Sequence, residues 1–269
     1  MLRKITVAIA SAGLLFGLAA CGSGNAESDD ELTVGATSVP HAEVLTYVKD
    51  NLAEKAGITL DVKEFSNYEQ LNPALNDGQL DANYFQHKPY LTESNQKTGQ
   101  KLEFVAGVHL EPLGVYSRKV ENLAELKQGA TVALPSDPSN LARALKLLAD
   151  NGVVTLKPGA GETATEKDVA SNPKDITFKP TDAAALPRQL DDVDASVING
   201  NYALEGKLNP AKDALALEKA EGNPYVNGIV TKADKKDDPQ IKKLVELLQG
   251  PEVKKFITDK YQGSVLPAA

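Results

Sequence analysis

The chain alternates short apolar runs with amphipathic stretches from residue 32 onward. LTVGAT predicts a buried strand, and the next stretch predicts a helix that ends at Gly57. The apolar residues with helical spacing in that stretch are Val44, Leu45, Val48 and Leu52. ITLDVKEF then alternates as a strand does, and NYEQLNPALNDGQLDA suits a helix and a turn. Strands and helices in turn at this spacing predict an α/β fold with a mostly parallel sheet.

A second cycle of the same kind begins at residue 129. GATVALP predicts a strand, DPSNLARALKLLADNG predicts a helix with a stop at Gly152, and VDASVING predicts another strand. Residues 157–175 between them are polar and are expected at the surface. The helical patterns DDPQIKKLVELLQG and PEVKKFITDKY end the chain. Two cycles and a helical tail predict two lobes.

The first 31 residues have a composition unlike the rest. MLRK is a short basic region, and the apolar run after it is short for a membrane span, which is typical of a signal peptide over residues 1–20. LAAC, ending at Cys21, resembles the lipobox of bacterial lipoproteins, in which the cysteine takes a diacylglycerol. The alternative is a simple secretory signal with an incidental cysteine. Cys21 is the only cysteine in the chain, and lipidation would use it.

Residues 21–31 are small, polar and acidic, and predict a flexible lipidated tether that holds a folded body at the membrane. The expected location is the extracytoplasmic face of the cell membrane. Loss of residues 1–20 removes Arg3 and Lys4 and no acid, so the formal net charge falls from −8 to −10. A charge of this sign argues against nucleic acid as a partner, because phosphate binding needs a basic face.

Motifs of the common enzyme classes do not occur in the sequence. It has no Gly-x-Ser-x-Gly elbow, no phosphate-binding loop with Gly-Lys-Ser/Thr and no His-Glu-x-x-His. We therefore expect a protein that is not an enzyme and needs no cofactor. A metal site is the sharper alternative, because three loops could bring His41, His87 and His109 together. No pair of histidines has ligand spacing on one helix, so the expected metal-ligand set is empty.

The stretch DANYFQHKPYL, residues 81–91, concentrates rings in a chain that is only 5% aromatic. Alternate residues of an extended segment face opposite ways. Asn83, Phe85 and His87 would then share one side, and Tyr84 and Gln86 the other. An amide, an apolar ring and an imidazole on one side predict the wall of a small-molecule cleft. The alternative, that the rings are core residues of a strand-to-helix junction, leaves the interleaved polar residues unexplained.

PSDPSNLARAL, residues 135–145, offers complementary chemistry. Its polar residues can cap the following helix, and free N–H groups at a helix start favour an anion. Arg143 in the first turns could bind a carboxylate through two parallel hydrogen bonds. The alternative is a surface arginine paired with a nearby acid. Asn199 and Asn227 lie at strand ends, where they would border a ligand crevice or merely shape turns.

Together these pieces resemble one family, the methionine-binding lipoproteins of ABC importers (the NlpA/MetQ type). DANYFQHKPYL, HLEPLGVYS, NLARALKLL, INGNYA and NPYVNGIV occur in the family's order over essentially the whole body. The resemblance implies a two-lobed periplasmic-binding-protein fold of type 2 with a ligand cleft between the lobes. Residues 32–115 with 225–269 would form lobe 1, and residues 116–224 lobe 2. The chain would cross between lobes near Pro112–Ser117 and Asn223–Ile229.

The resemblance also implies the ligand, the partners and the site. The protein would capture L-methionine, or D-methionine or a close derivative, and deliver it to an importer permease with its ATPase. The implied thioether contacts are Tyr68, Phe85 and His87. The implied contacts for the charged end are Arg143, Asn199 and Asn227, with Asn83 and Asn140 as neighbours.

Two departures from the family pattern bear on the ligand. Ser136 stands where the family often has an amide, and KAEGNPYVN differs from the commoner acidic lead-in to its strand. Neither touches the rings or Arg143. A zinc-type metal-binding lipoprotein and a surface adhesin stay as alternative functions.

Overall fold

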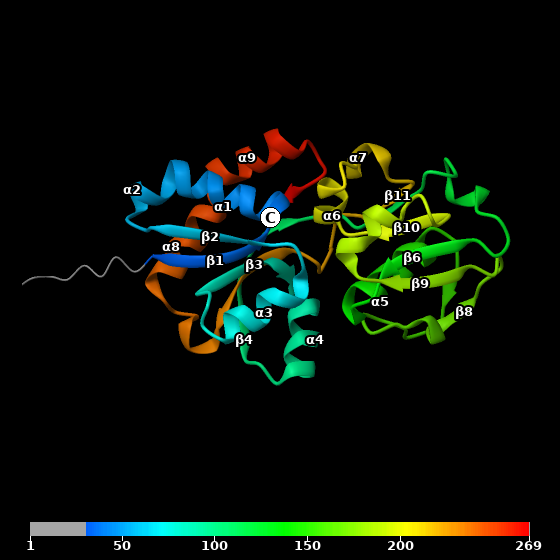
Figure 1. Ribbon diagram of the computed structural model, residues 1–269, viewed down its shortest axis with the longest axis horizontal. Coiled ribbons are helices and arrows are strands. Elements are labelled where there is room, and N and C mark those ends of the chain that lie inside the picture. The colour runs from blue at the N-terminus through cyan, green and yellow to red at the C-terminus, as the bar shows by residue number, and fades with distance from the viewer. Residues whose placement is uncertain (1–30, 269) are drawn as a thin grey trace, which may run out of the picture. The chain divides into compact units, whose positions relative to one another are not determined.

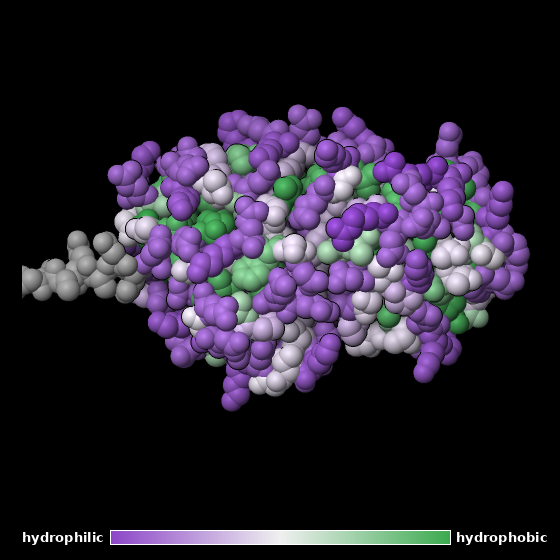
Figure 2. All heavy atoms as spheres, viewed as in Figure 1, coloured by the Kyte–Doolittle hydropathy of each residue, from purple (hydrophilic) through white to green (hydrophobic). Residues whose placement is uncertain are grey.

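The computed structural model describes residues 31–268, and the chain from Glu31 onward forms one compact unit (Figure 1). The predicted signal peptide, the predicted lipid-attachment residue Cys21 and nearly all of the predicted tether lie outside the described residues. Among the helices that are described, none is both long enough and apolar enough to cross a membrane. The face drawn in Figure 2 is mostly hydrophilic, with apolar residues in small scattered areas.

The first sheet carries lobe 1 and has the strand order β13-β4-β12-β3-β1-β2 (Figure 1). Its strands are β1 (Leu32–Thr37), β2 (Leu60–Phe65), β3 (Ala82–His87), β4 (Leu102–Leu110), β12 (Asn227–Lys232) and β13 (Leu266–Pro267). β1 is parallel to β2 and β3, whereas β12 is antiparallel to β3 and β4, and β13 is antiparallel to β4.

The second sheet carries lobe 2 and has the order β11-β5-β10-β6-β9. Its strands are β5 (Gly114–Tyr116), β6 (Thr131–Pro135), β9 (Thr177–Thr181), β10 (Ala195–Ile198) and β11 (Ala216–Leu217). A separate pair, β7 (Thr155–Leu156) and β8 (Val169–Ser171), lies in the predicted polar segment. β6 is parallel to β9 and β10, but β5 is antiparallel to β10 and β11. The prediction of a mostly parallel sheet is therefore wrong, because both sheets are mixed. The first strand after each passage between the sheets, β5 in one direction and β12 in the other, runs antiparallel to its neighbours.

Helices cover both faces of each sheet (Figure 1). The α-helices are α1 (Glu43–Val48), α2 (Glu54–Ala56), α3 (Tyr68–Asn76), α4 (Lys88–Thr98), α5 (Pro138–Asp150), α6 (Gly200–Glu205), α7 (Pro210–Asp213), α8 (Pro239–Leu248) and α9 (Pro251–Tyr261). The wider turns η1 (Ser38–Ala42) and η2 (Lys49–Ala53) flank α1. The 3-10 turns are η3 (Leu123–Glu125), η4 (Glu166–Asp168), η5 (Ala183–Gln189) and η6 (Ala233–Lys235).

Local chemistry sets the ends of the longer helices. Gly57 ends α2 in the left-handed conformation, as predicted, with φ of 67°. The Asp137 side chain caps α5 by accepting a hydrogen bond from the Asn140 N–H, and Pro138 occupies the first turn. Asp238 caps α8 in the same way. These caps fix where α5 starts, and with it the position of Arg143.

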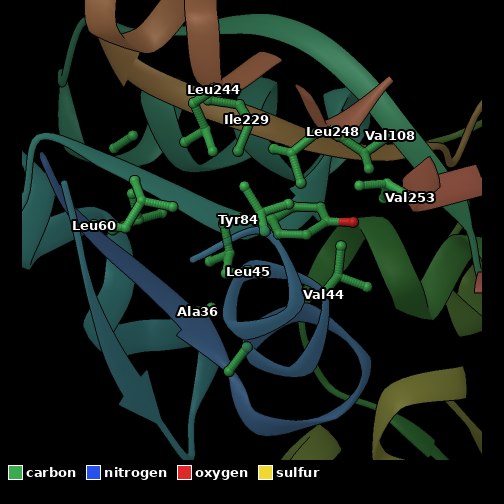
Figure 3. Close-up of a cluster of buried hydrophobic side chains, with 14 of the residues drawn as sticks. Ala36, Val44, Leu45, Leu60, Tyr84, Val108, Ile229, Leu244, Leu248 and Val253 are labelled. Atoms are coloured by element: carbon green, nitrogen blue, oxygen red, sulfur yellow. The ribbon is translucent and has the colours of Figure 1, made fainter. Parts of the chain in front are cut away.

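Each lobe has its own core. In lobe 1, α1, α8 and α9 pack on one face of the first sheet, where Leu45, Tyr84 and Leu244 lie together (Figure 3). Leu75 and Leu91 pack under α3 and α4 on the other face. In lobe 2, α5 packs on the second sheet. Each sheet thus packs against apolar layers of its own.

The chain passes from the first sheet to the second between β4 and β5, at residues 111–113, and returns between β11 and β12, at residues 218–226. These two stretches overlap the predicted crossings. The proposed lobe boundary after residue 115 falls inside β5, whose partners all belong to the second sheet. Residues that lie at these crossings can contact both lobes.

Candidate ligand-binding site

A cavity lies between the first and second sheets, and residues of both lobes line it. The lining residues are Tyr68, Phe85, Gln86, His87, Tyr90, Glu111, Asn140, Arg143, Gly200, Asn201 and Asn227. Its volume is about 10 Å³, close to that of one water-sized sphere. A ligand as large as an amino acid therefore needs the lobes to separate or the lining side chains to rotate.

The strand β3 places three consecutive side chains at this cavity, because its pairing with β12 is irregular. Gly228 pairs with Gln86 and Ile229 pairs with Tyr84, which leaves Phe85 as the extra residue of a bulge. A side chain at Gly228 would lie 2.0 Å from the Ala106 carbonyl oxygen, so only glycine fits this close approach. The predicted strict alternation is wrong at this point, since Phe85 and Gln86 both line the cavity.

Asn83 is buried, but it is not among the lining residues. Its amide nitrogen donates to Asn72 Oδ1 at 3.0 Å, and its Oδ1 accepts from Gln86 Nε2 at 2.8 Å. Gln86 also donates to Asn72 at 2.6 Å. Asn83 therefore belongs to an amide network that fixes Gln86, one layer behind the cavity wall.

The rings of the DANYFQHKPYL stretch divide between two environments. Tyr84 lies in the lobe 1 core, as the alternative interpretation expected (Figure 3). Phe85 and Tyr90 form a separate small cluster with Tyr68. The ring centroids lie 5.5 Å apart for Tyr68 and Phe85 and 5.6 Å apart for Phe85 and Tyr90. Tyr202 of lobe 2 closes the cluster at 4.8 Å from Tyr68. These rings make an apolar cage suited to a thioether or an alkyl chain.

His87 joins this cage to the polar end of the cavity. Its Nδ1 accepts a hydrogen bond from the Tyr90 backbone N–H at 3.2 Å, so the proton is on Nε2, which points at Asn140 Oδ1 at 3.2 Å. Burial, reinforced by the nearby Arg143 charge, lowers the pKa of His87 to about 3. The imidazole is therefore neutral at pH 7 and acts as a donor and a ring surface.

Arg143 is 3% exposed and is held from behind. Its Nε donates to Glu218 Oε1 at 3.0 Å, and its Nη2 donates to Glu218 Oε2 at 2.5 Å and to the Glu111 carbonyl oxygen at 3.0 Å. The Tyr225 ring lies 4.2 Å from its guanidinium carbon. Within the described residues Nη1 makes no hydrogen bond, so two N–H groups are available to a ligand carboxylate.

Glu218 is the acid that the alternative interpretation of Arg143 expected, but the pair is buried rather than at the surface. Burial alone would raise the pKa of Glu218, yet the Arg143 charge and its hydrogen bonds outweigh burial and lower it. Glu218 also accepts from the Leu113 N–H at 3.2 Å. Because residues 111–113 and 218–226 both connect the lobes, this carboxylate ties Arg143 to the two crossings.

The remaining predicted amides lie around Arg143. Asn140 accepts from Asn199 Nδ2 at 3.1 Å, and Asn227 lines the cavity. Asn199 is not a lining residue, but its Oδ1 is buried with no hydrogen-bond partner among the described residues. An unpaired buried acceptor is costly. Asn199 Oδ1 is therefore a buried acceptor that could take a further donor, one layer behind the cavity wall.

Comparison with known proteins shows the family of this chain. The family model of the NlpA lipoproteins matches residues 32–269. The chain belongs to the NlpA lipoprotein family. It is 43% identical over 258 residues to the methionine-binding lipoprotein MetQ of Bacillus subtilis, covering 94% of each chain, and 39% identical to the D-methionine-binding lipoprotein MetQ of Salmonella typhimurium, covering 96% of each.

A solved structure, a nutrient-binding protein from Burkholderia cenocepacia bound to methionine, is 47% identical. It superposes with a TM-score of 0.86, covering 88% of this chain and 100% of that one. The fold of this NlpA-family chain is accordingly the two-lobed α/β fold that the sequence predicted.

Several cavity residues of this family member were missed by sequence reasoning. Tyr90 and Glu111 lie in stretches that were recognised, DANYFQHKPYL and HLEPLGVYS, but neither was assigned a contact. Asn201 stands two residues after Asn199 in INGNYA. Its Oδ1 accepts from the Tyr68 hydroxyl across the lobes, and its Nδ2 is buried without a partner among the described residues. In the sequence, the signal for these contacts would have been polar residues inside short stretches that are otherwise expected to be buried.

Two of the three predicted histidines come together, without His87. His41, His109 and Glu111 are all buried, and their ligand atoms lie within 4.8 Å of one another. Thr37 Oγ1 lies 2.7 Å from His41 Nδ1, and the Tyr84 hydroxyl contacts His109 Nδ1. The group has the composition of a metal site, with His87 outside it at the cavity.

Proposed function

We propose that this NlpA-family protein captures methionine outside the cytoplasm and delivers it to the permease and ATPase of an ABC importer, without covalent chemistry. The observation that supports this most is the pairing of a buried arginine, with free N–H groups, and an aromatic cage in one cavity. A zwitterion with an apolar tail would match the polar and apolar ends of this cavity once the lobes or the lining side chains have moved to make room for it. The names of its relatives point to the same ligand.

In this proposal different side chains bind the thioether, the carboxylate and the rest of the charged end of methionine. The thioether lies among Tyr68, Phe85 and His87, where each sulfur-to-ring contact contributes about 0.3–1.5 kcal/mol. The carboxylate binds Arg143, and Asn140, Asn199 and Asn227 supply hydrogen bonds to the charged end. Asn83 acts through the amide network rather than by direct contact.

The lobes close over the ligand, and direct contacts between them support this. Asn67 Nδ2 donates to Asp182 Oδ2 at 2.9 Å, and Tyr68 contacts Asn201 and Tyr202. An outer groove of about 330 Å³ shares Tyr68 and Tyr90 with the cavity. Closure also creates the surface that a permease would recognise, while a lipid on Cys21 would keep the protein at the membrane.

The test is calorimetric titration of residues 22–269, unfolded and refolded to remove any carried-over ligand, with L-methionine, D-methionine, alanine and leucine. Tight one-site binding of methionine in the presence of a chelator is expected, and the ratio of the two enantiomers defines stereochemistry. At a thousandfold excess over the dissociation constant, methionine should add about 4 kcal/mol to the free energy of unfolding. No heat with either enantiomer would contradict the proposal.

A metal-binding function is the second candidate, because His41, His109 and Glu111 form a compact ligand group. Titration of the same protein with Zn²⁺ separates the two. Zinc binding without methionine binding would replace the proposed function by metal capture.

A further inference from the structure

The cavity has one cation and one carboxylate among its lining side chains in the described part of the chain. Arg143 is the cation and Glu111 the carboxylate. His87 lines the same cavity but is neutral, since burial lowers its pKa to about 3. The Arg143 charge is already matched by Glu218 outside the cavity. Glu111 therefore has no dedicated cation, and a buried carboxylate without one is costly.

Glu111 is held in place from behind. His109 Nε2 lies 2.7 Å and His41 Nε2 lies 3.1 Å from the same atom, Glu111 Oε1. Since a carboxylate only accepts, His109 donates its Nε2 proton and its Nδ1 accepts from the Tyr84 hydroxyl. This chain of donors orients the carboxylate and leaves the other oxygen, Oε2, for the cavity side.

The Oε2 side is shaped by the start of α6. A Cβ at Gly200 would lie 2.7 Å from Glu111 Cβ and 3.1 Å from Oε2, so the glycine lets the backbone of lobe 2 approach the carboxylate. Burial raises the pKa of Glu111, against the effects of His41, Arg143 and the Asn201 N–H. His109 thus orients Glu111 through a hydrogen bond, and His41 lies beside the same carboxylate oxygen.

We propose that Glu111 is the acceptor for the α-ammonium group of the ligand, and that it selects α-amino acids over the corresponding 2-hydroxy acids. The inference rests on the proposed function and adds the group that binds the α-ammonium of the amino acid. The amides of Asn199 and Asn227 accept a hydroxyl and an ammonium alike. A carboxylate favours the charged donor, because an ammonium adds Coulomb attraction to the hydrogen bond and a hydroxyl does not.

The experiment compares L-methionine with its 2-hydroxy analogue, 2-hydroxy-4-(methylthio)butanoate, by calorimetry at pH 7 on the body spanning residues 22–269. The wild type should prefer methionine by about tenfold to a hundredfold, as expected for loss of a charged hydrogen bond. Glu111→Gln should lose about tenfold or more in methionine affinity, while the affinity for the hydroxy acid changes less than about threefold. Glu205→Gln, an acid at the other end of α6, is the matched control and should preserve the preference.

The outcomes distinguish failure of the proposed function from failure of the role proposed for Glu111. If the wild type does not bind methionine at all, the proposed function fails. If it binds methionine and the hydroxy acid equally well, or if Glu111→Gln keeps the wild-type preference, the role of Glu111 is overturned while the function stands. If Glu111→Gln does not fold, the wild-type comparison of the two ligands still decides, and Glu111→Asp, which keeps the charge, should retain part of the preference.

Discussion

Arg143→Lys is the substitution that most directly tests how the cavity binds a carboxylate. It keeps the positive charge and removes the planar guanidinium. In the structure, Nε and Nη2 donate to Glu218 and to the Glu111 carbonyl oxygen, and in the proposed function Nη1 would donate to the ligand carboxylate. A lysine has one ammonium group on a flexible stem, and Glu218 would draw that group away from the cavity.

The magnitude follows from the bonds that the ligand would lose. Hydrogen bonds to charged groups contribute about 1.5–3 kcal/mol, and about 1.4 kcal/mol corresponds to a tenfold change in affinity. Arg143→Lys should therefore weaken methionine binding by about tenfold to a hundredfold. Calorimetry of the wild type and the variant measures this directly.

The matched control is Arg118→Lys, an exposed arginine that pairs with Asp191 at 3.2 Å. Exposed pairs contribute little, so methionine affinity should be unchanged there. A loss of less than about threefold for Arg143→Lys, with normal folding, would mean that charge alone suffices and that the guanidinium geometry is irrelevant.

Three further predictions follow from the same structure. Phe85→Ala should weaken methionine binding by about tenfold and alanine binding by much less, because only methionine reaches the cage; equal losses in calorimetry would assign Phe85 to packing alone. Gly228→Ala should lower the free energy of unfolding in urea by about 1–3 kcal/mol or more, because its Cβ meets the Ala106 carbonyl, whereas Gly161→Ala in an open loop should be near neutral. On acidification below pH 6.5, His41, His87 and His109 take up protons in the unfolded state but not in the folded state until about pH 3. Stability should therefore fall by up to about 4 kcal/mol per pH unit, less the opposing contribution of Glu111, Asp137 and Glu205, whose pKa values are raised by burial. A pH series of urea midpoints that stays flat between pH 6 and pH 4 would contradict this.

Much of the fold was readable from the sequence because its local patterns agree with its tertiary structure. Gly57, Asp137 and Asp238 end or begin helices by local backbone chemistry, so their neighbours alone define those ends. The direction of the strands was not readable. It depends on the two passages between lobes, and strand direction leaves no trace in the periodicity of a short buried strand.

The candidate site also combines residues that local sequence identifies with residues that only the tertiary structure reveals. Arg143 and the ring-rich strand were identifiable because their residue types are unusual for their surroundings. Glu218 was not, since it is 75 residues away in sequence and is one of many acids. The bulge at Phe85 was also invisible, because it arises from pairing with β12, whose Gly228 lies far along the chain. Contacts between residues far apart in the sequence determine the Glu218 pair and the bulge, and the residues near each position in the sequence do not reveal them.

The narrow cavity closed by both lobes has a kinetic consequence. In the proposed function, a molecule held behind the contacts of Tyr68 with Asn201 and Tyr202 would leave when the lobes separate and break these contacts. Hinge motions of domains take microseconds to milliseconds, so separation sets an upper limit on the release rate that every ligand shares. Ligands of different affinity would then differ in how often the lobes close again before escape. A partner that held the lobes apart would prevent this closing again, and would thereby speed the release of strongly bound ligands most.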